Sequence, residues 1–194
     1  TGVALKGSIK GNSFVVTNFA VVPTNSSKLS DGWASLSQVL KGGFKPGLTR
    51  TGISGPDLNI RYTRVPRVPD WQLRKLMGFE VAEVGGTSGS EVASDFNVLP
   101  ELPEIEGEDV VLLAMAKESM LEDHEDGVKD SGGSLDACTP NAIALYNAWL
   151  RFGVLMDDTV LVANIGHENI DVIIARGHDL LFARSLGGGS KLFD

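Results

Sequence analysis

The chain has 194 residues, of which 42% are apolar and 22% charged, and its formal net charge is −8. This composition is typical of one or two folded domains, and the acidic balance argues against proteins that bind nucleic acid or an anionic lipid surface. No run approaches the roughly 20 apolar residues of a membrane span, and the single cysteine, Cys138, excludes an internal disulfide framework and suits a reducing compartment.

The start of the chain predicts a β-hairpin. Apolar residues are frequent over 3–9 and 13–22, which favours two strands. Lys10-Gly11-Asn12 between them has the composition of a tight turn. We therefore expect two neighbouring antiparallel strands here.

A short helix and a third strand-like stretch are expected next. The helix is predicted over 29–40, with Ser30 or Asp31 as its N-cap and Gly42-Gly43 as its end. The stretch over 49–61 is rich in β-formers and is broken by a glycine-proline turn signal. Together with the hairpin this gives a β-β-α-β order.

The composition changes after residue 65. Pro66 and Pro69 indicate a connecting segment that crosses to the next part of the fold. Helical spacing of apolar residues over 71–81 predicts a helix with Asp70 as its N-cap. The glycine- and serine-rich stretch over 85–90 predicts a flexible loop.

A strand pair and a helix are predicted in the middle of the chain. A short strand is expected over 95–99 and an acidic, proline-containing loop over 100–109. Residues 110–116 are all apolar, which indicates a central strand covered on both faces. A helix with acidic exposed positions is predicted over 117–128.

The last part of the chain carries the most informative pattern. A helix is expected from Thr139-Pro140, with Pro140 at its first position, to Phe152-Gly153. An apolar strand then ends in the turn Asn164-Ile165-Gly166-His167, and a second strand follows. A third strand leads into the glycine cluster 187–189.

This pattern resembles the second phosphate loop of the actin-like ATPases, in which an Asp-x-Gly turn lies between two strands and a glycine pair follows one hairpin later. The spacing Phe182-x-Arg184-x-x-x-Gly188 narrows the resemblance to the PilM family of type IV pilus assembly proteins, which is related to FtsA. The Pro66–Pro69 crossing and the strand 110–117 stand in the same order as in that family.

The resemblance implies an α/β fold: an actin-like, ribonuclease H-like subdomain that carries an inserted small α+β subdomain of the 1C type. Residues 1–65 and 135–158 would form subdomain 1A, 66–134 the 1C-like insertion, and 159–194 the start of subdomain 2A. The family's first phosphate loop and the second half of its domain 2 have no counterpart here, so we expect a fragment of a larger protein.

The resemblance also implies where phosphate would bind. The matching positions are Asn164, Gly166, His167, Asn169, Gly187 and Gly188. The family's acidic residue organises Mg²⁺ through its waters, and Asn164 lacks that charge. Glu168 would repel phosphate if it pointed inward. We therefore expect ATP and Mg²⁺ to bind weakly or not at all and assign no catalytic residue; a working phosphate loop is the alternative.

A partner groove is the second implied site. In the PilM family the cleft beside subdomain 1C receives the N-terminal segment of the inner-membrane protein PilN. The groove residues implied here are Arg64, Arg67, Trp71 and Met77, whereas Phe79 is expected in the core. The resemblance implies a cytoplasmic scaffold held at the inner face of the inner membrane by its partners, with self-association left open. The alternative is an ATP-hydrolysing, FtsA-like protein that polymerises.

Three other residues invite a chemical interpretation. His124 lies among acidic residues, but a solvated helix face is favoured over a metal site. Cys138 has no histidine placed beside it by the sequence, so a structural thiol is favoured. His178 lies in a predicted hairpin turn. No metal ligand set is predicted.

Overall fold

The computed structural model describes residues 1–11, 13–24, 28–88, 91–101, 105–154 and 157–192. The chain divides into two compact units. Unit 1 contains residues 1–51 and 119–138, and unit 2 contains residues 52–118 and 139–194. These limits differ from the three predicted subdomains, whose boundaries stay a prediction.

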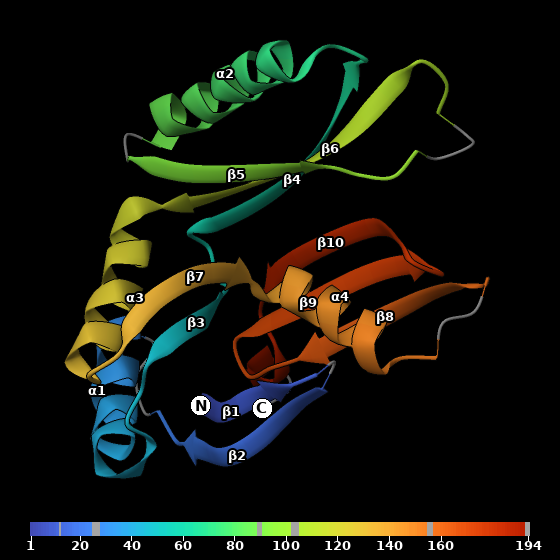
Figure 1. The fold of residues 1–194 in the computed structure, drawn as a ribbon. Coiled ribbons are helices and arrows are strands. Elements are labelled where there is room, and N and C mark those ends of the chain that lie inside the picture. The colour runs from blue at the N-terminus through green and yellow to red at the C-terminus, as the bar shows by residue number, and fades with distance from the viewer. Residues whose placement is uncertain (12, 25–27, 89–90, 102–104, 155–156, 193–194) are drawn as a thin grey trace. The chain divides into compact units, whose positions relative to one another are not determined.

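Unit 1 begins with the predicted hairpin. Strands β1 (Gly2–Lys10) and β2 (Ser13–Val22) pair antiparallel, with an irregularity between Lys6 and Gly7 (blue in Figure 1). Helix α1 (Leu29–Val39) contacts both strands. Asn12 of the predicted turn lies outside the described residues.

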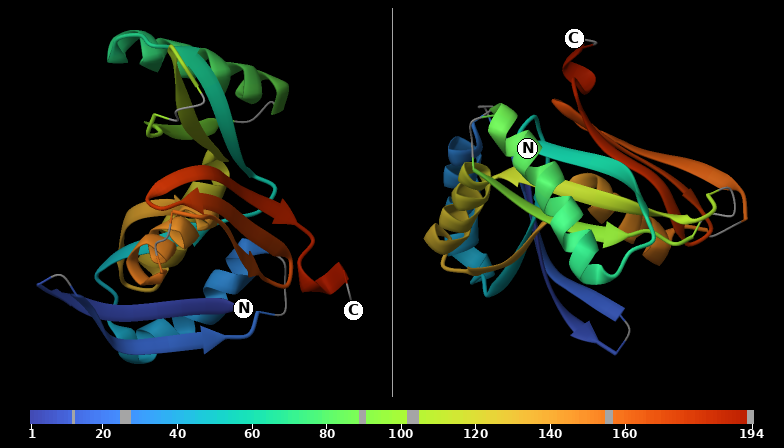
Figure 2. Two further views of the ribbon diagram at one scale, coloured as in Figure 1. Left: turned by 90° about the vertical axis from the view of Figure 1, so that its right-hand side faces the viewer. Right: turned by 90° about the horizontal axis from the view of Figure 1, so that it is seen from above.

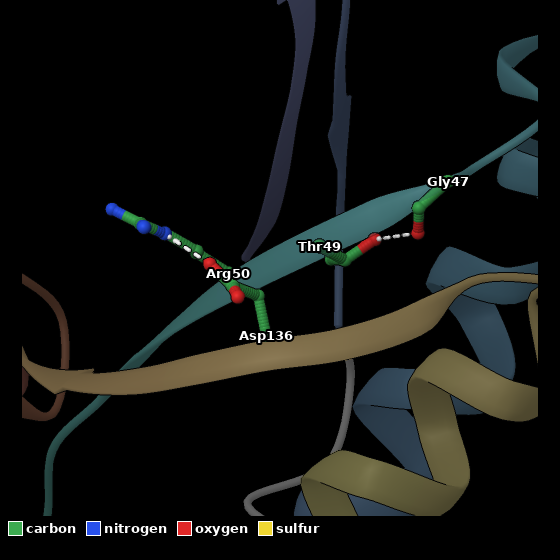
Figure 3. A network of polar contacts seen from close by, with 4 residues as sticks. All are labelled: Gly47, Thr49, Arg50 and Asp136. Carbon is green, nitrogen blue, oxygen red and sulfur yellow. Dashed lines mark hydrogen bonds and ion pairs between the residues drawn. The ribbon is translucent and has the colours of Figure 1, made fainter.

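The rest of unit 1 is a second strand pair with a helix. Strand β3 (Leu48–Ile53) pairs with β7 (Ser134–Pro140), and helix α3 (Glu118–Asp130) precedes β7 in the chain. Figure 3 shows the ion pair that joins the two strands, in which Arg50 Nε lies 2.6 Å from Asp136 Oδ2. In the same view Thr49 Oγ1 donates to the carbonyl of Gly47.

The predicted ends of the first helix are wrong. Lys28, rather than Ser30 or Asp31, is the N-cap, and the helix continues through the glycine pair as a π-helical turn, η1 (Leu40–Phe44). Leu40 and Phe44 are 7% and 5% exposed. Burial of these two side chains opposes the cost of about 1 kcal/mol for each glycine in a helix, so the chain stays helical there.

Unit 2 contains two three-stranded antiparallel sheets. In the first, β6 (Glu108–Lys117) lies between β4 (Leu58–Pro66) and β5 (Val92–Val98), and helix α2 (Asp70–Ser88) lies along one face (Figures 1 and 2). The predicted central position of the 110–116 strand is therefore confirmed.

Strand β6 is apolar on both faces because each face is covered. Val111, Leu113 and Met115 pack against Leu73 and Met77 of α2. On the opposite face Leu112 belongs to a second core cluster, which the other sheet of unit 2 and its helix supply. A strand buried twice needs apolar residues at consecutive positions, as the sequence predicted.

The second sheet has the order β10-β9-β8. Its strands are β8 (Thr159–Ile165), β9 (Asn169–Arg176) and β10 (Asp179–Gly187), and helix α4 (Asn141–Phe152) packs on them. A short 3-10 helix, η2 (Ser190–Leu192), follows β10.

Three sequence predictions need correction in unit 2. Helix α2 runs through Gly85-Gly86 to Ser88, because Val81 and Val84 still pack against the sheet; residues 89–90 of the predicted loop lie outside the described residues. Pro140 is the N-cap of α4 rather than its first residue. Phe79 is 73% exposed and is not core. Among the described residues, no helix is long and apolar enough to cross a membrane.

Candidate functional site

The six residues assigned to a phosphate site come together in unit 2. The turn between β8 and β9 contains Gly166 and His167, and it faces the segment that follows β10. Within the turn, the Gly166 N–H donates to the carbonyl of Asn169 at 2.9 Å. Asn169 opens β9 and pairs across the sheet with Gly187, the last residue of β10.

Backbone hydrogen bonds tie the two glycine-containing segments to each other. The N–H of Gly188 donates to the carbonyl of Glu168 at 2.8 Å, and the N–H of Ser190 donates to that of Gly166 at 2.8 Å. The N–H of Lys191 donates to the carbonyl of His167 at 3.1 Å. The turn therefore directs carbonyl oxygens at the 187–191 segment.

This close approach requires glycine at one position. Gly189 has φ +58, and a Cβ there would lie 2.5 Å from the carbonyl oxygen of Gly166. Only glycine adopts this conformation without cost and leaves room for the turn. In the structure the glycine cluster 187–189 leads from β10 into η2.

The side chains of the turn are polar and mutually satisfied. Glu168 forms an ion pair with Lys191, with Nζ 3.3 Å from Oε1, and His167 Nδ1 lies 3.4 Å from Ser190 Oγ. Lys191 thus offsets the negative charge that Glu168 brings to the turn.

A buried carboxylate that the sequence analysis missed lies beside Asn164. Asp171 on β9 is 2% exposed and is the direct cross-strand neighbour of both Asn164 on β8 and Ser185 on β10. Ser185 Oγ donates to Asp171 Oδ1 at 2.6 Å, and Asn164 Nδ2 lies 3.5 Å from Asp171 Oδ2. In the structure residues 171, 173 and 175 are buried in alternation, which places residue 171 on the inward face of β9; the sequence is apolar throughout 172–175 and carries no such alternation.

The donor set of this site is poor for Mg²⁺. Magnesium prefers carboxylates or its own waters held by carboxylates. Residue 164 offers an amide, and Asp171 is buried and already accepts a hydrogen bond. Among the described residues no group of three or more His, Cys, Asp or Glu side chains is arranged to hold a metal.

The residues assigned to a partner groove lie around the junction of β4 and α2. Arg64 is exposed on β4, and Arg67 after it pairs with Glu101 at 2.9 Å and Asp109 at 3.4 Å. Trp71 is 59% exposed, with Lys75 Nζ 5.2 Å from the centre of its ring. Met77 is 2% exposed and belongs to the core under α2, so it has no surface to offer a partner.

His124 is buried rather than solvated. It is 7% exposed, and the indole N–H of Trp33 on α1 donates to its Nδ1 at 3.3 Å. Burial lowers the pKa of the His124 imidazole, and the nearby Asp123 carboxylate partly opposes that shift. The prediction of a solvated helix face is wrong at this residue. The thiol of Cys138 lies 3.2 Å from Thr51 Oγ1.

The chain is similar to known proteins in structure and not in sequence. No family model matches the chain, and no curated protein matches its sequence. A chain of the PilM-PilN type IV pilus biogenesis complex superimposes with a TM-score of 0.77 and 22% identity, over 98% of this chain and 60% of that one.

A second solved structure is more distant. The cytoplasmic domain of EpsL, an inner-membrane component of the type II secretion system of Vibrio cholerae, gives a TM-score of 0.54 and 14% identity, over 97% of this chain and 66% of that one. This chain therefore spans less than two thirds of the length of either structure. At these identities the likeness shows the fold: the chain has the actin-like α/β fold that the resemblance implied.

Proposed function

We propose that the chain is part of a PilM-like scaffold of type IV pilus assembly, which acts in the cytoplasm at the inner face of the inner membrane. The observation that carries this proposal is the match of nearly the whole chain to a chain of the PilM-PilN complex. The scaffold would bind the N-terminal peptide of a PilN-like inner-membrane protein and would hold its position at the membrane through that partner.

The surface proposed for this peptide is the exposed junction of β4 and α2. Trp71 offers a large apolar face beside Lys75, and Arg64 adds positive charge, whereas Arg67 is held by Glu101 and Asp109. Aromatic and arginine side chains are the usual anchors of such contacts. Met77 is left out of this surface because it is buried.

The peptide proposal is tested by titrating the chain with the N-terminal peptide of a co-encoded membrane protein. Trp71→Ala should weaken binding at least tenfold, about 1.4 kcal/mol, if Trp71 is an anchor. Phe152→Ala is the matched control, because Phe152 is an exposed aromatic (82%) on another helix of the same unit. Equal effects of the two variants, or binding with no hydrogen-exchange protection over 64–75, would contradict the proposed surface.

We further propose that ATP binding is weak or lost. Asn164 lacks the charge that would organise Mg²⁺, and the N–H groups of Gly166, Gly188 and Ser190, which a phosphate would need as donors, already donate to backbone carbonyls. The clustering of Gly166, Gly188 and Gly189 favours the second candidate, an ATP-binding and polymerising FtsA-like protein, because it keeps the compact backbone of a phosphate turn.

Calorimetric titration with ATP, with and without Mg²⁺, decides between the two. We expect no tight binding by the chain as it stands. Asn164→Asp places a carboxylate next to buried Asp171, so the pair should take up Mg²⁺ and strengthen Mg²⁺-dependent nucleotide binding. Asn147→Asp on the exposed side of α4 is the charge-matched control. Micromolar Mg-ATP affinity of the unchanged chain would favour the FtsA-like candidate instead.

A further inference from the structure

A polar pocket of 240 Å³ lies in unit 2, at the opposite end of β4 from its junction with α2. It is bordered by the beginning of β4 and the second half of β10. The lining residues are Pro56, Leu58, Asn59, Ile60, Arg184 and Ser185.

The pocket is bordered by strand edges rather than strand faces. Successive side chains of a strand point to opposite faces, so a face contributes every second residue to a cavity. Here three consecutive residues of β4 and two of β10 line it. In the described part of the chain, β4 is paired only with β6 and β10 only with β9, so each is an edge strand of its sheet.

Backbone hydrogen bonds indicate which groups of β4 point outward. The carbonyl of Asp57 accepts from the N–H of Lys117, at the end of β6, whereas the N–H of Leu58 donates to the carbonyl of Gly55. Backbone groups alternate along an antiparallel strand. The N–H and C=O of Ile60 are therefore directed to the open edge, where an added strand would find them.

Arg184 gives the pocket an unpaired positive charge. Its side chain is exposed and has no hydrogen bond or ion pair with any residue that the structure describes. Two carboxylates beside the lining residues are engaged elsewhere, because Asp57 pairs with Lys117 at 2.5 Å and Asp171 accepts a hydrogen bond from the Ser185 hydroxyl at 2.6 Å. A ligand carboxylate would therefore find a guanidinium without a competing partner.

The site is preformed. Tyr62 of β4 stacks on Phe182 of β10, with ring centroids 5.7 Å apart and planes at 10°. Ile60 and Tyr62 also pack against the core cluster that contains Ala183. These contacts hold the two strand edges together next to the pocket, so a bound segment would not need to order them.

We propose that this pocket is a docking site for an extended peptide segment with a glutamate or aspartate side chain. The segment adds a strand at the open edges of β4 and β10, and its carboxylate pairs with Arg184. This site is separate from the surface around Trp71, at the other end of β4, and does not depend on the proposed function.

The test uses a displayed library of random peptides about seven residues long, the span of a typical strand. Selection on the chain should enrich acidic, β-prone sequences, and enriched peptides should protect the outward-facing amide of Ile60 from hydrogen exchange. Arg184→Glu should weaken the binding of those peptides at least tenfold, and Arg184→Gln should weaken it less.

Arg176→Glu is the matched control, since Arg176 is an exposed arginine of the same sheet that does not line the pocket. Circular dichroism of each variant checks that the fold is kept. The proposal is overturned if selection yields no acidic preference, if Arg176→Glu weakens binding as much as Arg184→Glu, or if protection falls elsewhere. Dimerisation seen by sedimentation and lost in Arg184→Glu would equally contradict a peptide partner.

Discussion

Strand β6 and the β1–β2 hairpin have similar apolar sequences but opposite surroundings. In β6, Val111 and Leu113 are fully buried, each at 0% exposure. In the hairpin, Leu5 and Phe19 are 62% and 68% exposed. The difference shows that an apolar strand sequence does not by itself establish that the strand is buried. Burial requires a helix or sheet from elsewhere in the chain to pack on the strand, as α2 packs on β6.

The largest expected loss of stability comes from truncating a side chain of β6 that α2 buries. Leu113→Ala should cost about 3 kcal/mol of unfolding free energy, because it leaves a cavity between β6 and α2. Leu5→Ala in the hairpin should change the free energy by no more than about 0.5 kcal/mol, since that side chain is already exposed. Urea unfolding of both variants measures the contrast. A comparable loss in Leu5→Ala would mean that the hairpin is covered in solution.

Two glycines next to the turn between β8 and β9, Gly189 and Gly187, differ in the same way, because only Gly189 is closely covered. Gly189→Ala should cost on the order of 2 kcal/mol locally, through its positive φ and its contact with the turn. Gly187→Ala is the control, because a Cβ at Gly187 meets nothing within 4 Å. Faster hydrogen exchange of the Ser190 and Lys191 amides in the first variant alone is the expected result. Equal exchange in both would show that the turn is not closed by this contact.

The packing of unit 1 should depend on pH through His124. Burial lowers its pKa in the folded state, so below the unfolded pKa of about 6.5 the unfolded chain binds the proton more readily. This contribution to stability is complete above that pKa and is lost as the pH falls below it. Protonation would also remove the Nδ1 acceptor of Trp33.

His124→Gln isolates that contribution. Between about pH 7.5 and pH 5.5 the variant should lose less unfolding free energy than the unchanged chain, since the other groups that titrate are common to both. Thermal unfolding followed by Trp fluorescence is a suitable measurement. Parallel pH profiles would show that His124 is not buried as neutral imidazole.

The smallest effect is expected on the surface of unit 1. Arg50→Gln removes the ion pair with Asp136, in which the two side chains are 77% and 31% exposed. Exposed pairs contribute roughly 0 to 1 kcal/mol and are screened by salt. The change should therefore be near the limit of detection and should vanish in about 1 M salt. A loss as large as that of Leu113→Ala would show that the β3–β7 pair depends on this contact.

The sequence predicted features that depend on neighbouring residues and missed those that depend on distant ones. The buried strand over 110–116 was predicted because its pattern is local. Helix α2 was predicted too short, since its last turns are held by the sheet rather than by propensity. Phe79 lies two residues after Met77, which is about 200° around the helix, so the two side chains are on opposite faces.

The candidate sites follow the same rule. Asn164, Gly166 and Gly188 were predicted to lie together because the pattern that resembles a phosphate turn is a short motif; their role in binding phosphate stays a prediction. Asp171 was missed because its environment is made by β8 and β10, which only the folded sheet brings to it. The open edge beside Arg184 likewise needs the crossing of β4 and β10, which no local pattern encodes.

The discontinuous make-up of unit 1 has a consequence for synthesis. Its two parts, 1–51 and 119–138, are separated by a segment that belongs to unit 2. On the ribosome, β3 therefore cannot pair with β7 until the chain has grown beyond residue 138, whereas the sheet of β4, β5 and β6 is complete once Lys117 has emerged. During that interval the apolar hairpin, α1 and β3 are present without α3 and β7. Pulse proteolysis of stalled nascent chains would reveal this order as late protection of the N-terminal segment and earlier protection of the central sheet.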